Sequence, residues 1–213
     1  MDEAGILKHL YAQQDLWHIA SEMRWWHESL FKHAVRTADL AMSVGYTLGL
    51  SFNEVKALML GGFLHDYGKV VWPKGMVEKC LLTDDDRILV ELHPSMSVWL
   101  AQANARLTDV VVLRIIEEHH ERNGRGYPRR LTNSDIHPLS KIVSCVECYT
   151  AQTEARPYRS HPLKRDDAFK ILYAEGFEPQ LLHALQQTLG GTEIRYVSDP
   201  DFEVGDGIKP CTT

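Results

Sequence analysis

The sequence predicts an all-α protein, built as a single-domain helical bundle. Apolar residues recur every three or four positions along most of the chain, whereas the strict alternation typical of strands is nearly absent. Capping residues and prolines, which are typical of helix N-termini, occur at intervals along this pattern. The chain of 213 residues also contains 11 histidines, about twice the usual share, and several fall on the predicted apolar faces. These observations predict a bundle whose core can hold a metal site.

Capping residues and prolines mark where the helices are expected to begin. Ser51 with Glu54 and Thr83 with Asp86 have the spacing of capping boxes, and Thr108 is a suitable N-cap. Three prolines suit the first helical turn, where a missing N–H is not needed. These prolines are Pro138, Pro162 and Pro179. Gly190-Gly191 is expected to close the last helix.

The domain organisation is expected to be simple, because no repeat, low-complexity tract or linker divides the chain. We predict an N-terminal helical extension at 1–26, a main domain at 27–191 and a C-terminal tail at 192–213. The tryptophans of the extension are expected to pack onto the bundle. They are Trp17, Trp25 and Trp26.

Composition restricts the partners and the location. The formal net charge of −6 argues against DNA or RNA, since their phosphates require an extended basic surface. No stretch reaches the ~18 apolar residues of a membrane span, and the first residues lack the basic flank of a signal peptide, so we expect a cytoplasmic protein. The segment from Glu121 to Arg130, in contrast to the whole chain, has more basic than acidic residues. Arg122, Arg125, Arg129 and Arg130 would suit a small anionic ligand, or form a solvated basic loop.

The cysteines give little indication of a site. Cys145 and Cys148 have half the pattern of a zinc site, but no second pair of cysteines or histidines follows at zinc spacing. We therefore expect both to be thiols that pack within a helix, with a redox or metal role as the alternative.

Ligand-type side chains lie on the apolar faces of several predicted helices. His33 stands seven positions before Leu40, and His93 four after Leu89. An unpaired polar group in such a place costs a few kcal/mol, so these side chains need partners. A single histidine of this kind is usually a satisfied core residue, but several on different helices indicate a shared metal site. The candidates are His33, His65, Asp66, His93 and Glu147.

His119 and His120 can join such a site only where the helix loosens. Successive residues of a helix diverge by about 100°, so two neighbouring rings do not normally reach one ion. Gly124 and Gly126 follow closely, which predicts that the pair lies at a helix C-terminus beside the arginine-rich segment.

Two segments resemble those of a known family. Residues 64–69 (L-H-D-Y-G-K) resemble the HD-x-G-K signature of HD-domain phosphohydrolases, and residues 119–128 (H-H-E-R-N-G-R-G-Y-P), here called the GYP loop, resemble the HHE…DGxGYP segment of the HD-GYP subfamily. Pro73, His93-Pro94 and residues 155–159 (A-R-P-Y-R) also agree. The chain is identified as a member of this subfamily from about His33 to Gln187.

The resemblance implies an HD-type bundle with two divalent metal ions, iron or manganese, and assigns roles to matching residues. Asp66 would bridge the ions and, with Lys69, act in catalysis. One ion would be held by His33, His65, Asp66 and Glu147, and the other by Asp66, His93, His119 and His120. The substrate would be contacted by Lys69, Arg156 and Arg159, and by Tyr127 unless this residue only packs in the loop.

The activity that the resemblance implies is hydrolysis of the bacterial messenger cyclic di-GMP to pGpG, with GMP as a further product. A related cyclic dinucleotide such as 3′3′-cGAMP is an alternative substrate, because no residue of the sequence can be assigned to recognition of the exocyclic groups of the bases. A nucleotide phosphohydrolase of the wider HD group would explain the metal site but not the GYP loop.

One departure from the family pattern supports a different class of function. Glu147 stands where the family usually has aspartate, and its extra methylene moves the carboxylate by ~1.5 Å. The chain would then be a catalytically weak or inactive module. Such a module would bind a cyclic dinucleotide, or a protein partner such as a diguanylate cyclase through the GYP loop.

Overall fold

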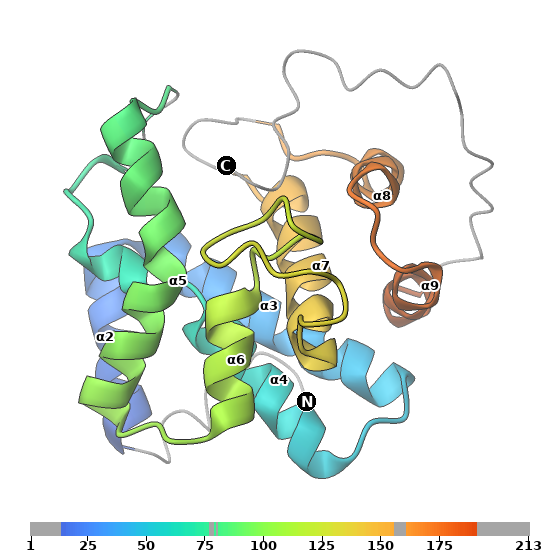
Figure 1. The fold of residues 1–213 in the computed structure, drawn as a ribbon, viewed down its shortest axis with the longest axis horizontal. Helices are drawn as coiled ribbons and strands as arrows, with labels where there is room; N and C mark the ends of the chain where they lie inside the picture. Colours follow the sequence, from blue (N-terminus) through green and yellow to red (C-terminus); the bar gives the residue numbers. More distant parts are fainter. Residues whose placement is uncertain (1–13, 77–78, 80, 156–160, 191–213) are drawn as a thin grey trace.

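The computed structural model describes residues 14–76, 79, 81–155 and 161–190, and this part of the chain is helical without any strand (Figure 1). The prediction of an all-α fold is confirmed. The α-helices are α2 (Gln14–Trp26), α3 (Glu28–Thr47), α4 (Phe52–Leu64), α5 (Asp84–Ala105), α6 (Val110–Glu118), α7 (Pro138–Thr153), α8 (Arg165–Ala174) and α9 (Pro179–Thr188), and a 3-10 helix, η1, spans Tyr67–Val71.

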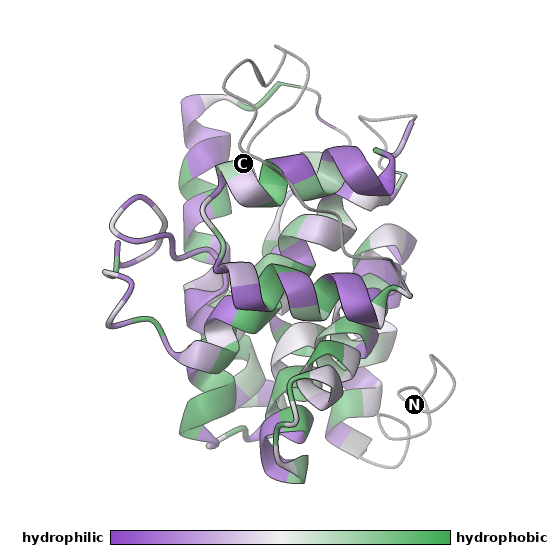
Figure 2. Ribbon diagram, turned by 90° about the vertical axis from the view of Figure 1, so that its right-hand side faces the viewer, coloured by the Kyte–Doolittle hydropathy of each residue, from purple (hydrophilic) through white to green (hydrophobic). Residues whose placement is uncertain are grey.

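The helices surround a main hydrophobic core, with α3 at its centre, and a smaller cluster contains Met76, Val90 and Tyr127. Helix α3 packs against α2, α4, α7 and α9, while α5 lies against α2, η1 and α6. The core is continuous from Ile19 in α2 to Leu185 in α9. Figure 2 shows hydrophilic residues interspersed with hydrophobic ones along the helices, as expected of amphipathic elements. Among the described residues, no helix is long and apolar enough to cross a membrane.

Most of the predicted helix starts are confirmed. Ser51 and Thr83 form complete capping boxes, and Pro138 and Pro179 lie in the first turns of α7 and α9. The prediction for Thr108 is wrong by one residue, because the Asp109 carboxylate accepts the N–H groups of the first turn of α6.

The prediction for Pro162 is also wrong. This proline precedes α8, which begins at Arg165 after Lys164 as its N-cap. Gly190 follows α9 with a φ of 70°, a backbone conformation that suits glycine and ends the helix.

The tryptophans of α2 pack less than expected. Trp25 is 75% exposed and Trp17 44%, and the Trp25 ring lies 4.4 Å from the ammonium group of Lys74. The prediction is therefore wrong for Trp25, whereas Trp26 is partly buried against the core. The face that packs is formed by residues spaced three or four apart, and Trp25 lies off it. These residues are Leu16, Ile19, Ala20 and Met23.

The two cysteines of α7 differ. Cys145 is a buried free thiol, and burial raises its pKa to about 12. Cys148 is disulfide-bonded, so the expectation of a thiol is wrong there. Neither belongs to a group of potential metal ligands among the described residues.

Candidate metal centre

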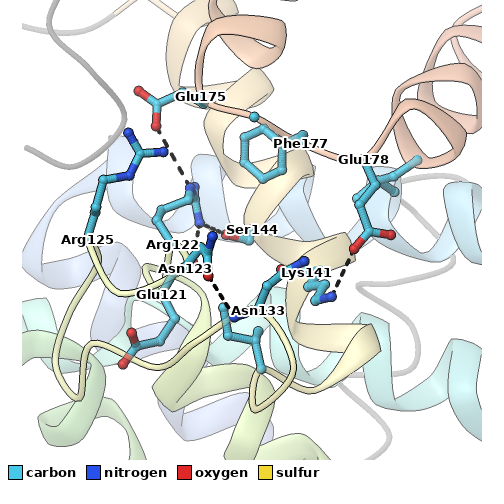
Figure 3. Close-up of a pocket in the computed structure, with 13 residues that line it drawn as sticks. Glu121, Arg122, Asn123, Arg125, Asn133, Lys141, Ser144, Glu175, Phe177 and Glu178 are labelled. Carbon is cyan, nitrogen blue, oxygen red and sulfur yellow. Dashed lines mark hydrogen bonds and ion pairs between the residues drawn. The ribbon is translucent and has the colours of Figure 1, made fainter.

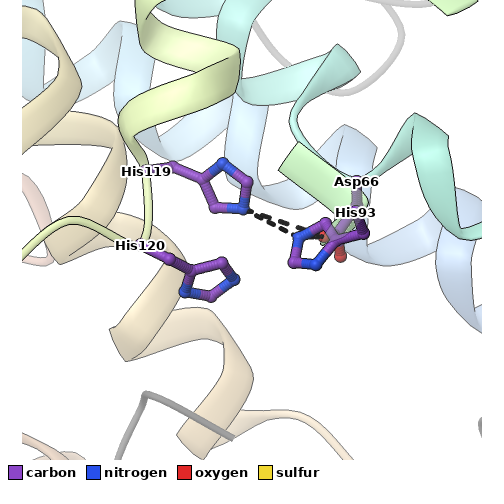
Figure 4. Close-up of side chains that lie close together, drawn as sticks. All are labelled: Asp66, His93, His119 and His120. Atoms are coloured by element: carbon purple, nitrogen blue, oxygen red, sulfur yellow. Dashed lines mark hydrogen bonds and ion pairs between the residues drawn. The ribbon is translucent and has the colours of Figure 1, made fainter. Parts of the chain in front are cut away.

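Side chains from α3, α5 and the segments that follow α4 and α6 meet in the core. Figure 4 shows four of them, Asp66, His93, His119 and His120. His33 lies on α3, His65 caps the C-terminus of α4, and Asp66 immediately follows. His93 comes from the middle of α5. Helix α6 ends at Glu118, so His119 and His120 lie at its C-terminus, as the sequence predicts. All six side chains are at most 5% exposed.

Asp66 belongs to two groups of potential metal ligands. The first group contains Asp66, His93, His119 and His120, and the second contains His33, His65 and Asp66. Within each group the potential ligand atoms lie within 4.8 Å of one another. A carboxylate shared by two groups is the arrangement in which one residue can bridge two ions.

The two oxygens of Asp66 face different histidines. Oδ2 lies 3.4 Å from Nε2 of His65 and 3.9 Å from Nε2 of His33. Oδ1 lies 3.1 Å from Nε2 of His93 and 4.0 Å from Nε2 of His119. Each oxygen therefore belongs to one of the two groups.

Backbone carbonyls orient three of the histidine rings. Nδ1 of His65 donates to the Gly62 carbonyl at 2.8 Å, and Nδ1 of His119 donates to the Ile116 carbonyl at 2.7 Å. These carbonyls lie in the last turns of α4 and α6, where they have no helical N–H partner. Because a carbonyl only accepts, the proton resides on Nδ1 and the Nε2 lone pair faces the centre of the site.

The backbone carbonyl that orients the His93 ring lies in the middle of helix α5. Pro94 has no N–H, so the carbonyl of Val90, four residues earlier, lacks its usual helical donor. Nδ1 of His93 donates to this oxygen at 2.6 Å. The proline thus frees the acceptor that fixes the neighbouring ring.

Replacing Pro94 with alanine is expected to weaken metal binding without destabilising the fold. The backbone N–H that alanine restores would bond to the Val90 carbonyl and compete with His93, lowering metal affinity about tenfold. The metal-free protein should be at least as stable, because proline inside a helix costs about 3 kcal/mol. Metal titration against a chelator and urea unfolding measure both effects. Pro179→Ala, in a first turn, is the control, and equal metal affinity in Pro94→Ala would contradict the role of the freed carbonyl.

Burial keeps the histidines of the first group neutral. It lowers the pKa of His93 to about 4, with a further contribution from Lys69. Burial likewise holds the pKa values of His119 and His120 well below the usual range. Burial opposes ionisation of Asp66, but His65 and Lys69 outweigh it and hold the Asp66 pKa well below its usual value. At neutral pH the first group therefore presents the neutral imidazoles of His93, His119 and His120 and the carboxylate of Asp66.

The metal-free protein should lose stability as the pH falls below about 6.5. The unfolded chain binds a proton at His93 near pH 6.5, but the folded chain does so only near pH 4. Stability is thus present above pH 6.5 and declines toward pH 4, by about 1 kcal/mol at pH 5.5 from His93 alone. Urea unfolding in the presence of a chelator, between pH 7.5 and 5.5, measures this slope.

The matched variants for this measurement are His93→Gln, which should reduce the slope while His119 and His120 retain the rest of it, and His183→Gln, which replaces an exposed histidine of α9 and serves as the control. A slope that is the same in His93→Gln and the original chain would contradict the assignment.

Lys69 and Tyr127 lie close to the centre. Nζ of Lys69 donates to Oδ2 of Asp66 at 2.7 Å. The Tyr127 ring is 6% exposed and stacks on the His120 ring with 4.6 Å between centroids. Its buried hydroxyl makes no hydrogen bond to a described residue. This placement favours the packing interpretation of Tyr127 over contact with a base.

The remaining predicted site residues divide into two sets. Glu147 on α7 has Oε1 3.9 Å from Nε2 of His33, but it belongs to neither group of potential ligands. Arg156 and Arg159 lie outside the described residues.

Sequence reasoning missed carboxylates that support the site. Oε2 of Glu154 lies 2.9 Å from Nδ1 of His33, so it orients this ring as the carbonyls orient the others. Glu154 follows the last residue of α7 and is seven residues after Glu147, a spacing that is visible in the sequence. Glu121 accepts the N–H groups of Arg129 and Leu131, both at 2.7 Å, and fastens the segment after His120.

The donor set fits a metal ion. Nε2 of His93 and Nε2 of His119 are 3.1 Å apart, although both Nδ1 protons are committed to carbonyls. Two facing lone pairs repel each other unless a cation lies between or beside them. In addition, Nδ1 of His120 is buried and makes no hydrogen bond to a described residue. Imidazole and carboxylate donors suit zinc, iron or manganese.

Comparison with known proteins agrees with this geometry. The family model for the HD domain matches residues 23–178. The chain therefore belongs to the HD domain family, and the resemblance to its HD-GYP members is confirmed by the relatives it matches.

Two of these relatives are bacterial phosphodiesterases. A 3′3′-cGAMP-specific phosphodiesterase of Vibrio cholerae is 34% identical over 61% of this chain and 30% of its own length. The cyclic di-GMP phosphodiesterase response regulator RpfG of Xanthomonas campestris is 32% identical over 70% of this chain and 41% of its own. The chain thus spans less than half the length of these relatives.

Solved structures show the same fold. An HDG"Y"P protein from Bdellovibrio bacteriovorus aligns over 75% of this chain and 52% of its own, with a TM-score of 0.60 and 27% identity. The HD domain of the Listeria monocytogenes phosphodiesterase PgpH, solved with cyclic-di-AMP, aligns over 84% of this chain and 99% of its own, with a TM-score of 0.58 and 16% identity.

Proposed function

We propose that the chain hydrolyses cyclic di-GMP to pGpG, and in a second hydrolysis to GMP, with two divalent metal ions, iron or manganese. The observation that carries this proposal is the pair of ligand groups that share Asp66. The relatives of similar sequence that are named as cyclic di-GMP phosphodiesterases support the substrate. Residues 27–191 would form the hydrolase domain.

The proposed ligands follow the two groups. One ion would be held by His33, His65 and Asp66 together with Glu147. The other would be held by Asp66, His93, His119 and His120. When bound, such ions lower the pKa of a bound water and offset charge on a phosphodiester. Asp66 supplies an ionised carboxylate for this purpose, because its pKa is held low.

Lys69 is proposed to place its ammonium group on a non-bridging oxygen of the scissile phosphate. Nζ is already 2.7 Å from Oδ2 of Asp66, so the cation would lie beside the metal ligands, where negative charge would develop on the phosphate oxygens. Arg156 and Arg159 would contact a phosphate or guanine. They follow Ala155, which lines a cavity of about 470 Å³ beside Glu154 and Arg36.

Two alternatives rest on specific observations. The relative specific for 3′3′-cGAMP favours that dinucleotide as a second candidate substrate. The position of Glu147 outside both ligand groups favours a weak or inactive module, which would bind a cyclic dinucleotide or a diguanylate cyclase through the GYP loop.

The decisive experiment is turnover by protein purified without oxygen and analysed for iron and manganese. Cyclic di-GMP and 3′3′-cGAMP are incubated separately, and ion-exchange chromatography resolves each remaining cyclic dinucleotide from its products, which are pGpG and GMP for cyclic di-GMP and a mixed adenine-guanine linear dinucleotide for 3′3′-cGAMP. Faster hydrolysis of cyclic di-GMP, lost in the His65→Ala/Asp66→Ala variant, would support the proposal. Faster hydrolysis of 3′3′-cGAMP would change the substrate, and no turnover with two metals per chain would support the binding module.

A further inference from the structure

A second pocket lies next to the metal centre but is lined by different residues. It has a volume of about 220 Å³ and lies between the segment after α6, the first half of α7 and the α8–α9 corner (Figure 3). Its charged lining residues are Glu121, Arg122, Arg125, Lys141, Glu175 and Glu178. None of the potential metal ligands among the described residues lines it.

Arg122 is the residue that this pocket leaves incompletely bonded. Its side chain is buried, with the whole residue 8% exposed. Nη1 donates to the carbonyls of His119 and Glu121, at 3.3 and 2.9 Å, and to the Ser144 hydroxyl. Nε and Nη2 make no hydrogen bond to a described residue. Leaving buried charged donors unbonded is costly, so a partner is expected.

The geometry of the two unbonded donors specifies the partner. Nε and Nη2 lie along one edge of the guanidinium, the edge that binds both oxygens of a carboxylate or phosphate. The group is held against the Phe177 ring, with 4.5 Å between the guanidinium carbon and the ring centroid. This contact and the hydrogen bonds of Nη1 hold the guanidinium in place before any ligand arrives.

The carboxylates of the pocket do not already provide this partner. Both oxygens of Glu121 accept backbone N–H groups, and Glu178 pairs with Lys141 at 2.9 Å. Oε2 of Glu175 lies 4.0 Å from Nε of Arg122, which is too far for a hydrogen bond. Arg125, exposed on the same pocket, adds a second cation.

We propose that this pocket binds a small oxyanion, a carboxylate or a phosphate group, through Nε and Nη2 of Arg122, with Arg125 at the rim. A volume below the range of about 300–1,000 Å³ usual for drug-sized ligands favours a small metabolite over a dinucleotide. Glu175 competes with this anion for Arg122. The proposal does not depend on hydrolysis at the metal centre.

The test is isothermal titration of the metal-loaded full chain with inorganic phosphate and, separately, with succinate, at constant ionic strength. Arg122→Gln is expected to weaken the binding of the preferred probe about tenfold, because it removes a charged bidentate donor. Glu175→Gln is expected to strengthen binding several-fold, because it removes the competing carboxylate. The probe that binds more tightly identifies the class of oxyanion.

Controls separate this pocket from other anion sites. Arg130→Gln makes the same charge change on an exposed residue outside the pocket and should leave binding unchanged. Because Arg122→Gln also removes internal hydrogen bonds, Glu175→Gln and Arg125→Gln at the rim keep the test valid if that variant fails to fold. Binding that is absent, insensitive to Arg122, or no tighter in Glu175→Gln would overturn the proposal.

Discussion

Replacing Asp66 with asparagine is expected to lower the proposed phosphodiesterase activity about a thousandfold or more. The amide keeps the size of the side chain but removes the charge and leaves a single oxygen ligand, so the two ligand groups no longer share a carboxylate. Losing metal-assisted catalysis costs several kcal/mol of transition-state stabilisation, which corresponds to this factor in rate. The variant should also lose bound metal.

The measurement combines metal analysis by mass spectrometry with turnover of cyclic di-GMP. Asp109→Asn is the matched control, because asparagine serves equally well as the N-cap of α6 and this residue lies outside both ligand groups. An Asp66→Asn protein that keeps both its metal content and its rate would contradict the bridging role.

Replacing Glu118 with glutamine is expected to destabilise the folded protein by about 3 kcal/mol. The carboxylate is fully buried, and each oxygen accepts two donors. Oε1 accepts from Arg114 at 2.6 Å and from Arg129 at 3.0 Å. Oε2 accepts from the His137 N–H at 2.8 Å and the Ser140 hydroxyl at 2.9 Å. Whichever oxygen becomes NH₂ would face two other donors.

Urea unfolding of the metal-free proteins measures this effect. The neighbouring variant Glu117→Gln is the control, since Glu117 makes a partly exposed ion pair with Arg129 and should cost less than about 1 kcal/mol. Equal midpoints for the two variants would show that the buried network contributes little. A loss confined to Glu118→Gln would show that this carboxylate fastens the segment after α6.

The fold and the positions of the histidines were predictable because both follow from helical periodicity. Residues such as His33 and His93 share a face with core leucines, so their burial could be inferred before their partners were known. Glu118 is not a candidate metal ligand, but it stands three residues after buried Ile115. The same spacing rule applies to Glu118.

Other features could not be inferred from local patterns. The exposure of Trp25 depends on its angle around α2 relative to Met23, not on its hydrophobicity. The division of Asp66 between two sets of histidines depends on how α3, α4 and α5 pack, which no spacing within one helix specifies. The pocket at Arg122 likewise needs the α8–α9 corner, which is distant in sequence.

The carbonyls that orient His65, His93 and His119 belong to the main chain of Gly62, Val90 and Ile116. Every amino acid supplies that acceptor, so exchanging Val90 or Ile116 for another apolar residue leaves the ring orientation intact. His33 differs, since its partner is the side chain of Glu154. Among natural variants of this chain, exchanges between apolar residues that core packing allows should therefore be tolerated at 90 and 116, whereas any loss of Glu154 should coincide with a change at His33.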